Sequence, residues 1–354
     1  MWQQGPEAGT FYRNLVKLGI GFMGKPCESA CMHCKGRGGG GAGEKRPVGN
    51  PRKPVSCHEA MRVAQRIDEW RKERGIDLLI TFGGADTPDY PGVFDEMRFV
   101  RRLYNRRGFA CNGMAMRTRA ELDEWFHEAK EAGTKIVFTT FYGTREFHDW
   151  FAGRDGDFDL MIDTAKAIAH NGLYNCHTLF VSKSTTPYLA ELSDILDALP
   201  GKKHLGYRPI LNKMEVLTDE SERYTRDEYL ALPERYRRAH HYPMGTRREW
   251  RDHVLGDRFR EDTRDERLHT IIDVGDVDLE AFYARPVEAF LDDVIDAELA
   301  KRERTPTVRE LAERYGDRRI DSELLFTLFD LHMEWMYLWR QEHPGFVPYY
   351  ATIE

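Results

Sequence analysis

Three cysteines stand close together near the start of the chain, at a spacing that can hold a metal centre. Cys27, Cys31 and Cys34 form a C-x3-C-x2-C pattern directly after the first strand-like run. Three thiolates within so short a segment can hold three irons of a four-iron cubane cluster, which normally takes four thiolates. The fourth iron is then open to a ligand that the chain does not supply.

Structural zinc is the alternative, with His33, His58 or Cys57 as the fourth ligand, and reduced thiols without metal are a further one. Zinc sites usually take their second pair of ligands from another close pair of Cys or His residues, and no second C-x2-C or H-x3-H pair follows. The pattern therefore favours an iron–sulfur cluster. Because no cysteine follows Cys176, we expect a single cluster.

Composition narrows the class of protein. The chain has 354 residues, enough for one large domain or one domain with a smaller appended one. Its formal charge of −7, from 52 basic and 59 acidic residues, gives no sign of a nucleic-acid partner. The sequence has neither an apolar run of membrane-spanning length nor a signal peptide at its start, so we expect a cytoplasmic protein without a membrane partner.

Apolar runs and helix signals alternate over residues 15–211. We expect strands at 15–22, 77–82, 108–111, 135–141, 174–181 and 204–211. We expect helices after the capping boxes Ser56–Glu59 and Thr118–Glu121, and over 94–104, 158–171 and 187–199. Strands and helices in this order imply an α/β fold, with a parallel sheet and right-handed crossovers curved into a full or partial barrel.

Ligands of such sheets bind at the carboxyl ends of the strands. The cysteine loop follows the first expected strand, and Gly83–Gly84 follows the second. Cys111–Gly113 and Tyr142–Gly143 follow the third and fourth. We therefore expect these segments to meet at one rim.

Over residues 15–211 the chain resembles the radical SAM superfamily, whose core is a partial (βα)6 barrel, and in particular its peptide-modifying branch. His33 stands where that family usually has an aromatic residue or His. The resemblance implies that Cys27, Cys31 and Cys34 hold one [4Fe-4S] cluster, whose open iron is chelated by S-adenosyl-L-methionine (SAM). An electron from the cluster would split SAM to a 5′-deoxyadenosyl radical, which takes a hydrogen atom from a substrate carbon.

The resemblance also implies a set of residues that bind SAM. Gly83, Gly84 and Asp86 stand in place of the family's Gly-Gly-Glu-Pro motif, which receives the methionyl ammonium, although Asp86 is shorter than Glu and displaced by one position. Arg154, in the segment 146–158, matches an arginine that pairs with the SAM carboxylate, a group that suits a planar guanidinium. The alternative is an exposed arginine in an acidic loop. The candidate cofactor-binding residues are Gly83, Gly84, Asp86, Asn112, Arg154 and Val181, the last where the family holds the adenine.

The remaining cysteines are candidate hydrogen-atom donors, which an epimerase would need. Cys111 comes first, because it lies at an expected strand end facing the site, followed by Cys176 and Cys57; the alternative for each is a small buried apolar residue.

The expected reaction is modification of a ribosomal peptide natural product by epimerisation, crosslinking or cyclisation. One alternative is an epimerase or dehydrogenase of a small metabolite such as an aminosugar, favoured by the missing auxiliary-cluster cysteines and by the lack of a leader-binding domain before the first strand. The other is a non-catalytic iron–sulfur or zinc protein.

We divide the chain into a lead-in (1–14), the radical SAM core (15–212) and a mainly helical C-terminal region (213–354) that shapes the substrate pocket. In that region we expect helices after the capping boxes at Thr225 and Thr307, a further helix over 324–340, and two strands around a turn over 269–277.

Basic residues around the cysteines suggest a docking patch for an acidic flavodoxin or ferredoxin that donates electrons, the alternative being a solvated loop. These basic residues are Lys25, Lys35, Arg37, Lys45, Arg46, Arg52 and Lys53.

Overall fold

The computed structural model describes residues 11–22, 27–32, 55–84, 87–209, 220–259 and 267–349. The strands in this part are β1 (Leu15–Phe22), β2 (Leu79–Gly84), β3 (Gly108–Ala110), β4 (Ile136–Phe141), β5 (Tyr174–Val181), β6 (Lys203–Pro209) and β7 (Leu268–Asp273). The helices between β1 and β6 are α1 (Cys57–Glu73), α2 (Val93–Tyr104), α3 (Arg119–Glu131), α4 (Arg145–Ala152), α5 (Asp157–His170) and α6 (Leu189–Ala198). Those after β6 are α7 (Arg226–Ala231), α8 (Glu234–Arg237), α9 (Arg247–Leu255), α10 (Leu279–Ala284), α11 (Val287–Arg304), α12 (Val308–Tyr315) and α13 (Leu328–Glu342).

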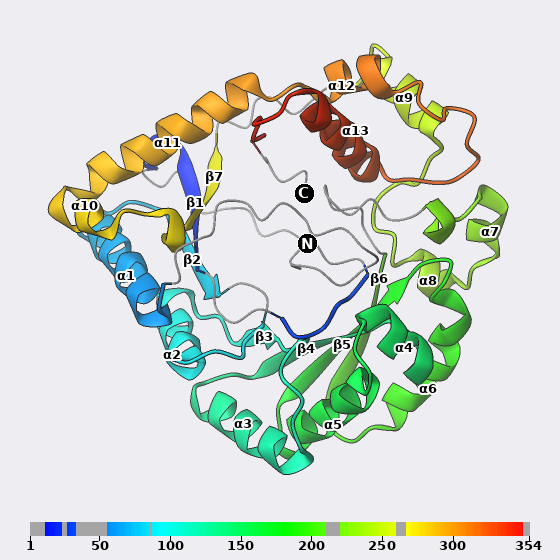
Figure 1. The fold of residues 1–354 in the computed structure, drawn as a ribbon, viewed down its shortest axis with the longest axis horizontal. Helices are drawn as coiled ribbons and strands as arrows, with labels where there is room; N and C mark the ends of the chain where they lie inside the picture. Colours follow the sequence, from blue (N-terminus) through cyan, green and yellow to red (C-terminus); the bar gives the residue numbers. More distant parts are fainter. Residues whose placement is uncertain are drawn as a thin grey trace.

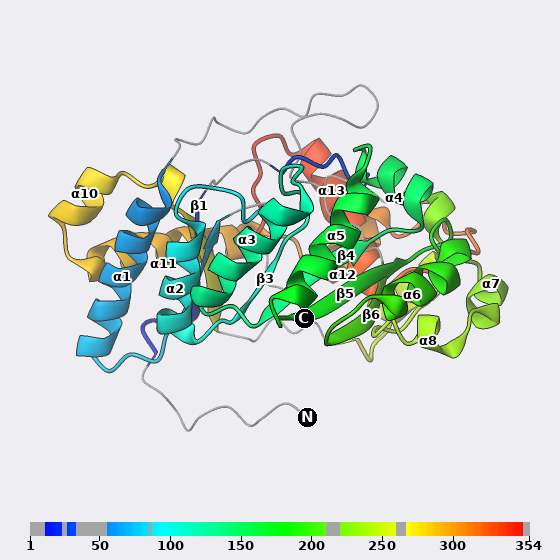
Figure 2. The same cartoon turned by 90° about the horizontal axis from the view of Figure 1, so that it is seen from below.

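The strands form two parallel sheets, ordered β2-β1-β7 and β3-β4-β5-β6. They curve around the centre of the molecule, with α1 to α6 on the outside (Figures 1 and 2). The predicted alternation of strands and helices and the parallel pairing are confirmed. Among the described residues no strand pairing joins β2 to β3, so a closed barrel is not seen.

Alternating side chains of the strands pack outward against these helices. In β1, Leu18, Ile20 and Phe22 are buried in one apolar cluster with side chains of α1. The capping box of Ser56 and Glu59 fixes the start of α1, as predicted. The intervening β1 positions, beginning with Lys17, therefore face the opposite side of the sheet, which we call the inner face.

The segment 269–277 is not a pair of strands, and this prediction was wrong. It contains one strand, β7, which pairs in parallel with β1 along the edge opposite β2. At its end the Asp273 carboxylate accepts a hydrogen bond of 3.0 Å from the Gly275 amide and begins a 3-10 turn instead of a hairpin. A strand from the predicted C-terminal region thus shares a sheet with the first strand of the predicted core.

The other main elements in the described part of the C-terminal region are helices, and the predicted capping boxes at Thr225 and Thr307 are present. Helices α9, α12 and α13 share an apolar cluster that includes Leu311, Trp335 and Met336. Helix α13 begins only at Leu328, after a capping box of Thr327 and Asp330. None of the helices in the described part of the chain combines the length and the apolar character needed to span a bilayer.

Candidate functional site

The segment 27–32, with two of the three clustered cysteines, crosses the carboxyl ends of β3 and β4. The Glu28 amide donates a hydrogen bond of 2.9 Å to the Gly113 carbonyl, in the loop after β3. The amides of Ala30 and Met32 donate bonds of 2.5 and 2.9 Å to the carbonyls of Ala152 and Phe151, at the end of α4. The backbone of the cysteine loop is therefore fixed to the rim that the sequence predicted.

Two glycines make this close approach possible. Gly113 has φ of +77°, and a Cβ there would lie 2.0 Å from the Cys27 Sγ. Gly153 has φ of +60°, and its Cβ would lie 2.5 Å from the Ala30 Cβ and 2.8 Å from the Ala30 carbonyl oxygen. Both positions combine a left-handed backbone with a contact that excludes any side chain. The sequence alone gave these two glycines no such role, because the contact depends on segments far apart in the chain.

An aromatic cluster supports Cys31. The Tyr142 hydroxyl donates to the Cys31 Sγ across 3.4 Å. The Tyr142 ring stacks on Phe151 and Phe180, with ring centroids 4.5 and 5.7 Å away. Phe180 belongs to the inner face of β5, so the second cysteine lies over the inner edge of the sheet.

Several predicted site residues lie outside the described residues. These are Cys34 and His33 of the cysteine segment, Asp86, and all seven basic residues of the proposed docking patch. Within the described ranges no three His, Cys, Asp or Glu side chains are grouped to hold a metal ion. Of the residues suggested as zinc ligands, His58 pairs with Asp95 at 3.1 Å, and the Cys57 thiol donates to the Gly92 carbonyl. The three-cysteine site stays a prediction.

Arg154 is not an exposed loop residue, because only 11% of its side chain is accessible. Its Nε donates to the Asp157 carboxylate at 2.9 Å, its Nη2 contacts the same oxygen, and its Nη1 donates to the Met114 carbonyl at 2.6 Å. The other Asp157 oxygen lies 3.1 Å from the His148 Nε2. Because the His148 Nδ1 accepts a bond from the Tyr142 amide, its Nε2 carries the proton and donates to Asp157.

This network joins the loop after β3, helix α4 and the start of α5, and it reaches the cysteine loop through Tyr142. Burial alone would raise the pKa of Asp157, but the hydrogen bond from His148 and the charge of Arg154 outweigh it and hold that pKa below its ordinary value. Asp157 is therefore ionised near neutral pH and balances the Arg154 charge. The network was missed from the sequence, although the short spacing of His148, Arg154 and Asp157 was a signal for it.

The Gly83–Gly84 pair ends β2 beside a buried carboxylate that sequence reasoning missed. The Gly84 amide lies 3.4 Å from Glu96 Oε2 on α2, and the Tyr90 hydroxyl donates to the same oxygen. Burial raises the pKa of Glu96 above its ordinary value, although these bonds and the charge of Arg106 oppose the rise. A signal existed, since Glu96 shares one helical face with Val93 and Val100.

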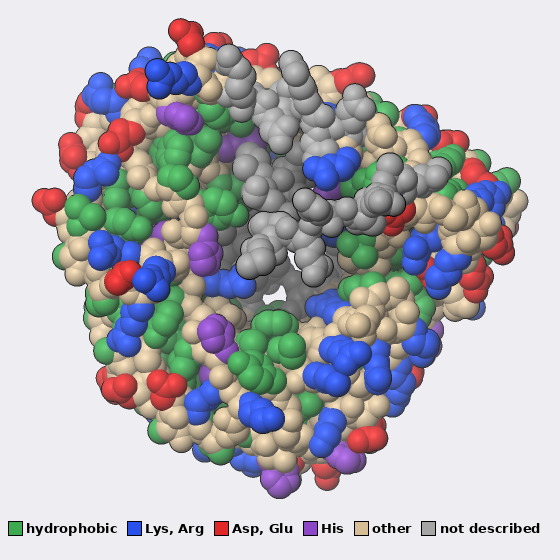
Figure 3. Space-filling model, turned by 180° about the vertical axis from the view of Figure 1, so that it is seen from behind, with side chains coloured by type: hydrophobic (Ala, Val, Ile, Leu, Met, Phe, Trp, Pro, Cys, Tyr) green, Lys and Arg blue, Asp and Glu red, His purple; other side chains and the backbone are tan. Residues whose placement is uncertain are grey.

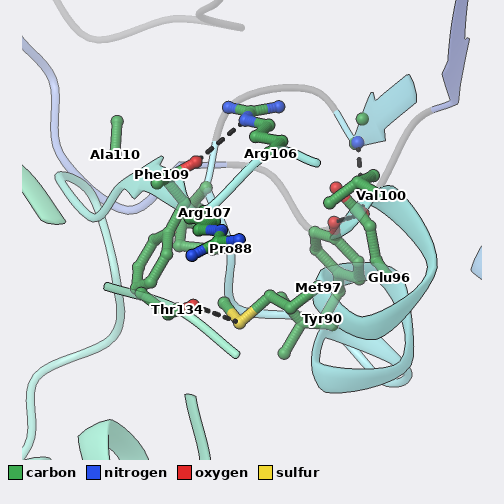
Figure 4. Close-up of a pocket in the computed structure, with 15 residues that line it drawn as sticks. Pro88, Tyr90, Glu96, Met97, Val100, Arg106, Arg107, Phe109, Ala110 and Thr134 are labelled. Atoms are coloured by element: carbon green, nitrogen blue, oxygen red, sulfur yellow. Dashed lines mark hydrogen bonds between the residues drawn. The ribbon is translucent and has the colours of Figure 1, made fainter. Parts of the chain in front are cut away.

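A cavity of about 140 Å³ adjoins this carboxylate in the unpaired gap between β2 and β3 (Figure 4). It is lined by both glycines, by Tyr90 and Glu96, and by Arg106 and Phe109 from the β3 side. A cavity of this size has room for several water molecules or one small polar group.

Two further candidates for cofactor binding have defined contacts. The Asn112 side chain donates from Nδ2 to the Thr140 carbonyl at 3.0 Å and accepts at Oδ1 from the Thr140 backbone amide at 2.8 Å, so it takes the place of a backbone partner at the end of β4. Val181 is buried with Leu189 and Leu192 of α6, on the outer face of β5. At this strand end, a ligand on the inner face could therefore contact the Val181 backbone and the Phe180 side chain, but not the Val181 side chain.

The three remaining cysteines differ in where they lie. Cys111 is 2% exposed within the outer apolar cluster of α3, so its expected orientation toward the site was wrong. Cys57 is equally enclosed in the cluster of α1, and burial raises the pKa of each thiol to about 12. Cys176 is partly exposed and alternates with buried residues of β5, which places it on the inner face, four residues before Phe180.

Comparison with known proteins gives little further information. No protein-family model matches the chain, and no curated protein does. Among solved structures, SuiB of Streptococcus suis bound to S-adenosylmethionine aligns with a TM-score of 0.38 and 12% identity, over 60% of this chain and 44% of that one. A second structure of SuiB aligns with a TM-score of 0.36 and 12% identity, over 56% and 40% of the two chains. This chain thus spans less than half of SuiB. Sequence identities and TM-scores this low assign the chain to no family.

Proposed function

We propose that this protein is a radical SAM enzyme built on a partial (βα)6 barrel. The observation that carries the proposal is the docking of the Cys27–Cys31 segment onto Gly113 and Gly153, at the carboxyl ends of parallel strands. Gly113 leaves room for the Cys27 thiol, and the Tyr142 hydroxyl donates to the Cys31 sulfur. These contacts fit a site in which both sulfurs have fixed positions. Cys27, Cys31 and Cys34 would hold the [4Fe-4S] cluster, which when bound supplies the electron that cleaves SAM and so starts hydrogen-atom abstraction.

The same rim offers groups for the rest of SAM. The Gly83 and Gly84 backbone and Asp86 would receive the ammonium, and Asn112 and Val181 would lie near the adenosyl part. For Arg154 the structure adds a condition. Since Asp157 occupies the edge formed by Nε and Nη2, and Nη1 already donates one N–H to the Met114 carbonyl, a SAM carboxylate would be met by the second N–H of Nη1 and the second N–H of Nη2.

We propose modification of a ribosomal peptide, by epimerisation, crosslinking or cyclisation, as the reaction. Epimerisation or dehydrogenation of a small metabolite such as an aminosugar is the second candidate, favoured by the absence of any cysteine after Cys176 in the sequence. If the reaction needs a hydrogen donor, the inner-face position of Cys176 makes it a better candidate than Cys111 or Cys57. A flavodoxin or ferredoxin remains the expected electron donor.

Anaerobic reconstitution tests the proposal. The full chain, loaded with iron and sulfide and reduced with dithionite in the presence of SAM, should contain about four irons and release 5′-deoxyadenosine. Cys31→Ala should abolish both, whereas Cys57→Ala, which removes a thiol buried elsewhere, should keep both. A colourless protein with one zinc per chain and no 5′-deoxyadenosine would instead favour the non-catalytic alternative.

A further inference from the structure

Among the residues that the structure describes, part of the inner face of the sheets is exposed where a parallel sheet is usually covered. Parallel sheets are normally buried on both faces, and closed barrels fill their interior with layers of side chains. Here three apolar side chains on inner positions remain accessible: Ile271 of β7 at 78%, Leu79 of β2 at 47% and Phe138 of β4 at 42%. The molecule is hollowed at its centre when seen from behind (Figure 3).

Small residues keep this interior open. Gly19 of β1 is paired in register with Thr81 of β2 and Ile271 of β7, and a Cβ on it would lie 2.9 Å from the Ile271 Cγ1. Across the interior, Gly206 of β6 is paired with Thr178 of β5. Small side chains in the middle of the strands leave apolar surface that a ligand can reach.

The charges on the inner face are mostly positive and unpaired. Lys17 of β1 and Arg208 of β6 form no ion pair or side-chain hydrogen bond in the part of the chain that the structure describes. His269 pairs in register with Lys17, and His204 lies on the same face of β6 as Arg208. The acid of this face, Asp273, accepts the bond from the Gly275 amide and takes part in further interactions.

The setting of Lys17 and Arg208 differs from that of many cations on the outside of the protein. The chain as a whole carries a net charge of −7, and many of its outer arginines pair with carboxylates, as Arg98 does with Asp95. A cationic interior in an anionic protein attracts anions and disfavours cations. Arg208 is also placed to meet a ligand near the cysteines, because it pairs in register with Phe180, which stacks on Tyr142.

We propose that the inner face binds a substrate that has an apolar body and an anionic group, a carboxylate in the simplest case. Arg208 anchors the anion at the rim, Lys17 is a second cation deeper inside, and the walls formed by Ile271, Leu79 and Phe138 hold the apolar part. The inference names the substrate class of the proposed radical SAM enzyme and rests on that function for its catalytic meaning. The binding itself needs neither SAM nor the cluster.

A pair of fluorescent probes tests the binding on the full chain without cofactors. 8-Anilinonaphthalene-1-sulfonate has an apolar body with an anionic group, and N-phenyl-1-naphthylamine has the same rings without the charge. The anionic probe should bind the wild type more tightly, and added salt should weaken its binding while leaving the neutral probe unchanged. Arg208→Gln should weaken the anionic probe about tenfold, as for the loss of one charged hydrogen bond, and the neutral probe less than twofold.

Matched variants separate this site from general surface charge and from misfolding. Arg102→Gln removes an exposed arginine on the outside, on α2, and should leave both probes unchanged. Arg208→Lys keeps the charge and should retain most of the affinity, and Lys17→Gln should weaken the anionic probe alone. Equal effects of Arg102→Gln and Arg208→Gln, or salt-independent binding of the anionic probe, would overturn the proposal.

Displacement of the anionic probe identifies the source of the carboxylate. Octanoate is compared with octanamide, and an acetylated, amidated Leu-Leu-Glu-Leu-Leu peptide with its Gln counterpart. Displacement of the probe by the acidic peptide alone supports a peptide substrate, and displacement by octanoate alone supports a small acid. If the neutral compounds displace the probe as strongly as the acids, the anion site is refuted. If the protein does not load iron but the probe results are as expected, the proposed function is refuted and the anion site remains. If the protein loads iron and cleaves SAM but the probe results are not as expected, the radical chemistry remains and this substrate class is refuted.

Discussion

The contact between Gly113 and Cys27 gives a sharp test of the proposed cluster site. In Gly113→Ala the new methyl group would lie 2.0 Å from the Cys27 Sγ, but 3.2 Å from the Cβ and 3.6 Å from the Cα of the same residue. Rotation of the cysteine side chain alone can therefore relieve most of the overlap. The sulfur then leaves the position that the loop gives it, while the backbone keeps its place.

The size of the effect differs between folding and metal binding. An alanine at φ of +77° strains the folded backbone and lowers the free energy of unfolding by about 1–2 kcal/mol. Alanine also restricts the unfolded chain, which raises the free energy of unfolding by about 0.4–1 kcal/mol. An off-rotamer or repositioned Cys27 side chain adds about 0.5–1.5 kcal/mol. We expect the free energy of unfolding to fall by about 1–2 kcal/mol, whereas cluster loading should fall several-fold, since one of three thiolates is turned away.

Gly172→Ala is the matched control. Gly172 has φ of +69°, close to that of Gly113, and nothing lies within 4 Å of the position its Cβ would take. It should lose about 1 kcal/mol of stability from the left-handed backbone and load iron like the wild type. Gly153→Ala should be the most severe of the three variants, because its methyl would meet the Ala30 carbonyl oxygen at 2.8 Å and the loop backbone must move.

The assay combines urea unfolding of the apo chains with iron and sulfide content after anaerobic reconstitution. Gly113→Ala that loads as much iron as Gly172→Ala would refute the reasoning. The same holds if both variants lose iron equally, because the loss would then follow from backbone strain and not from the contact with Cys27.

Three other predictions concern the groups around this site. Asp157→Asn should cost about 3 kcal/mol at pH 7, because it leaves the Arg154 charge buried without its partner. The lowered pKa of Asp157 means that this stabilisation is fully present above the ordinary value of 3.8 and is lost as the pH falls through the folded-state pKa, so urea unfolding of the two proteins should converge in acid. Tyr142→Phe keeps the ring stacking and should change unfolding by less than about 1 kcal/mol, but should shorten the time for which a chelator-challenged protein retains iron. Burial raises the pKa of both Cys111 and Cys176, but Cys176 is partly exposed whereas Cys111 is enclosed, so iodoacetamide should modify Cys176 faster than Cys111; mass spectrometry that finds Cys111 modified as fast would contradict its placement.

Features fixed by local physics were predictable from the sequence. The capping boxes at Ser56 and Thr118 start α1 and α3 as expected, because the reciprocal bonds between a cap and the residue three positions on need no tertiary contact. The expected strands 15–22 and 174–181 coincide with β1 and β5, since their apolar runs end at clear turn signals. The meeting of strand ends at one rim follows from parallel order alone.

Features that depend on a one-residue register or on distant contacts were not predictable. β3 ends at Ala110, which faces inward and is exposed, so Cys111 points to the opposite face. A shift of one residue reverses the side on which every side chain of a strand lies, and a run of four residues does not determine that choice. The pairing of β7 with β1, more than two hundred residues apart, likewise depends on an edge that only the folded sheet provides.

The position of Cys176 along β5 links the candidate hydrogen donor to the proposed substrate site. It lies four residues before Phe180 on the same face of β5, which is about 13 Å along the strand at about 3.3 Å per residue. In register, its neighbours are Phe138, an exposed part of the apolar wall, and His204. A thiol at that depth can reach only a substrate that extends from the rim into the interior. The proposed elongated, partly apolar substrate would therefore pass within reach of Cys176, whereas a donor at Cys111 would require the outer apolar cluster to open.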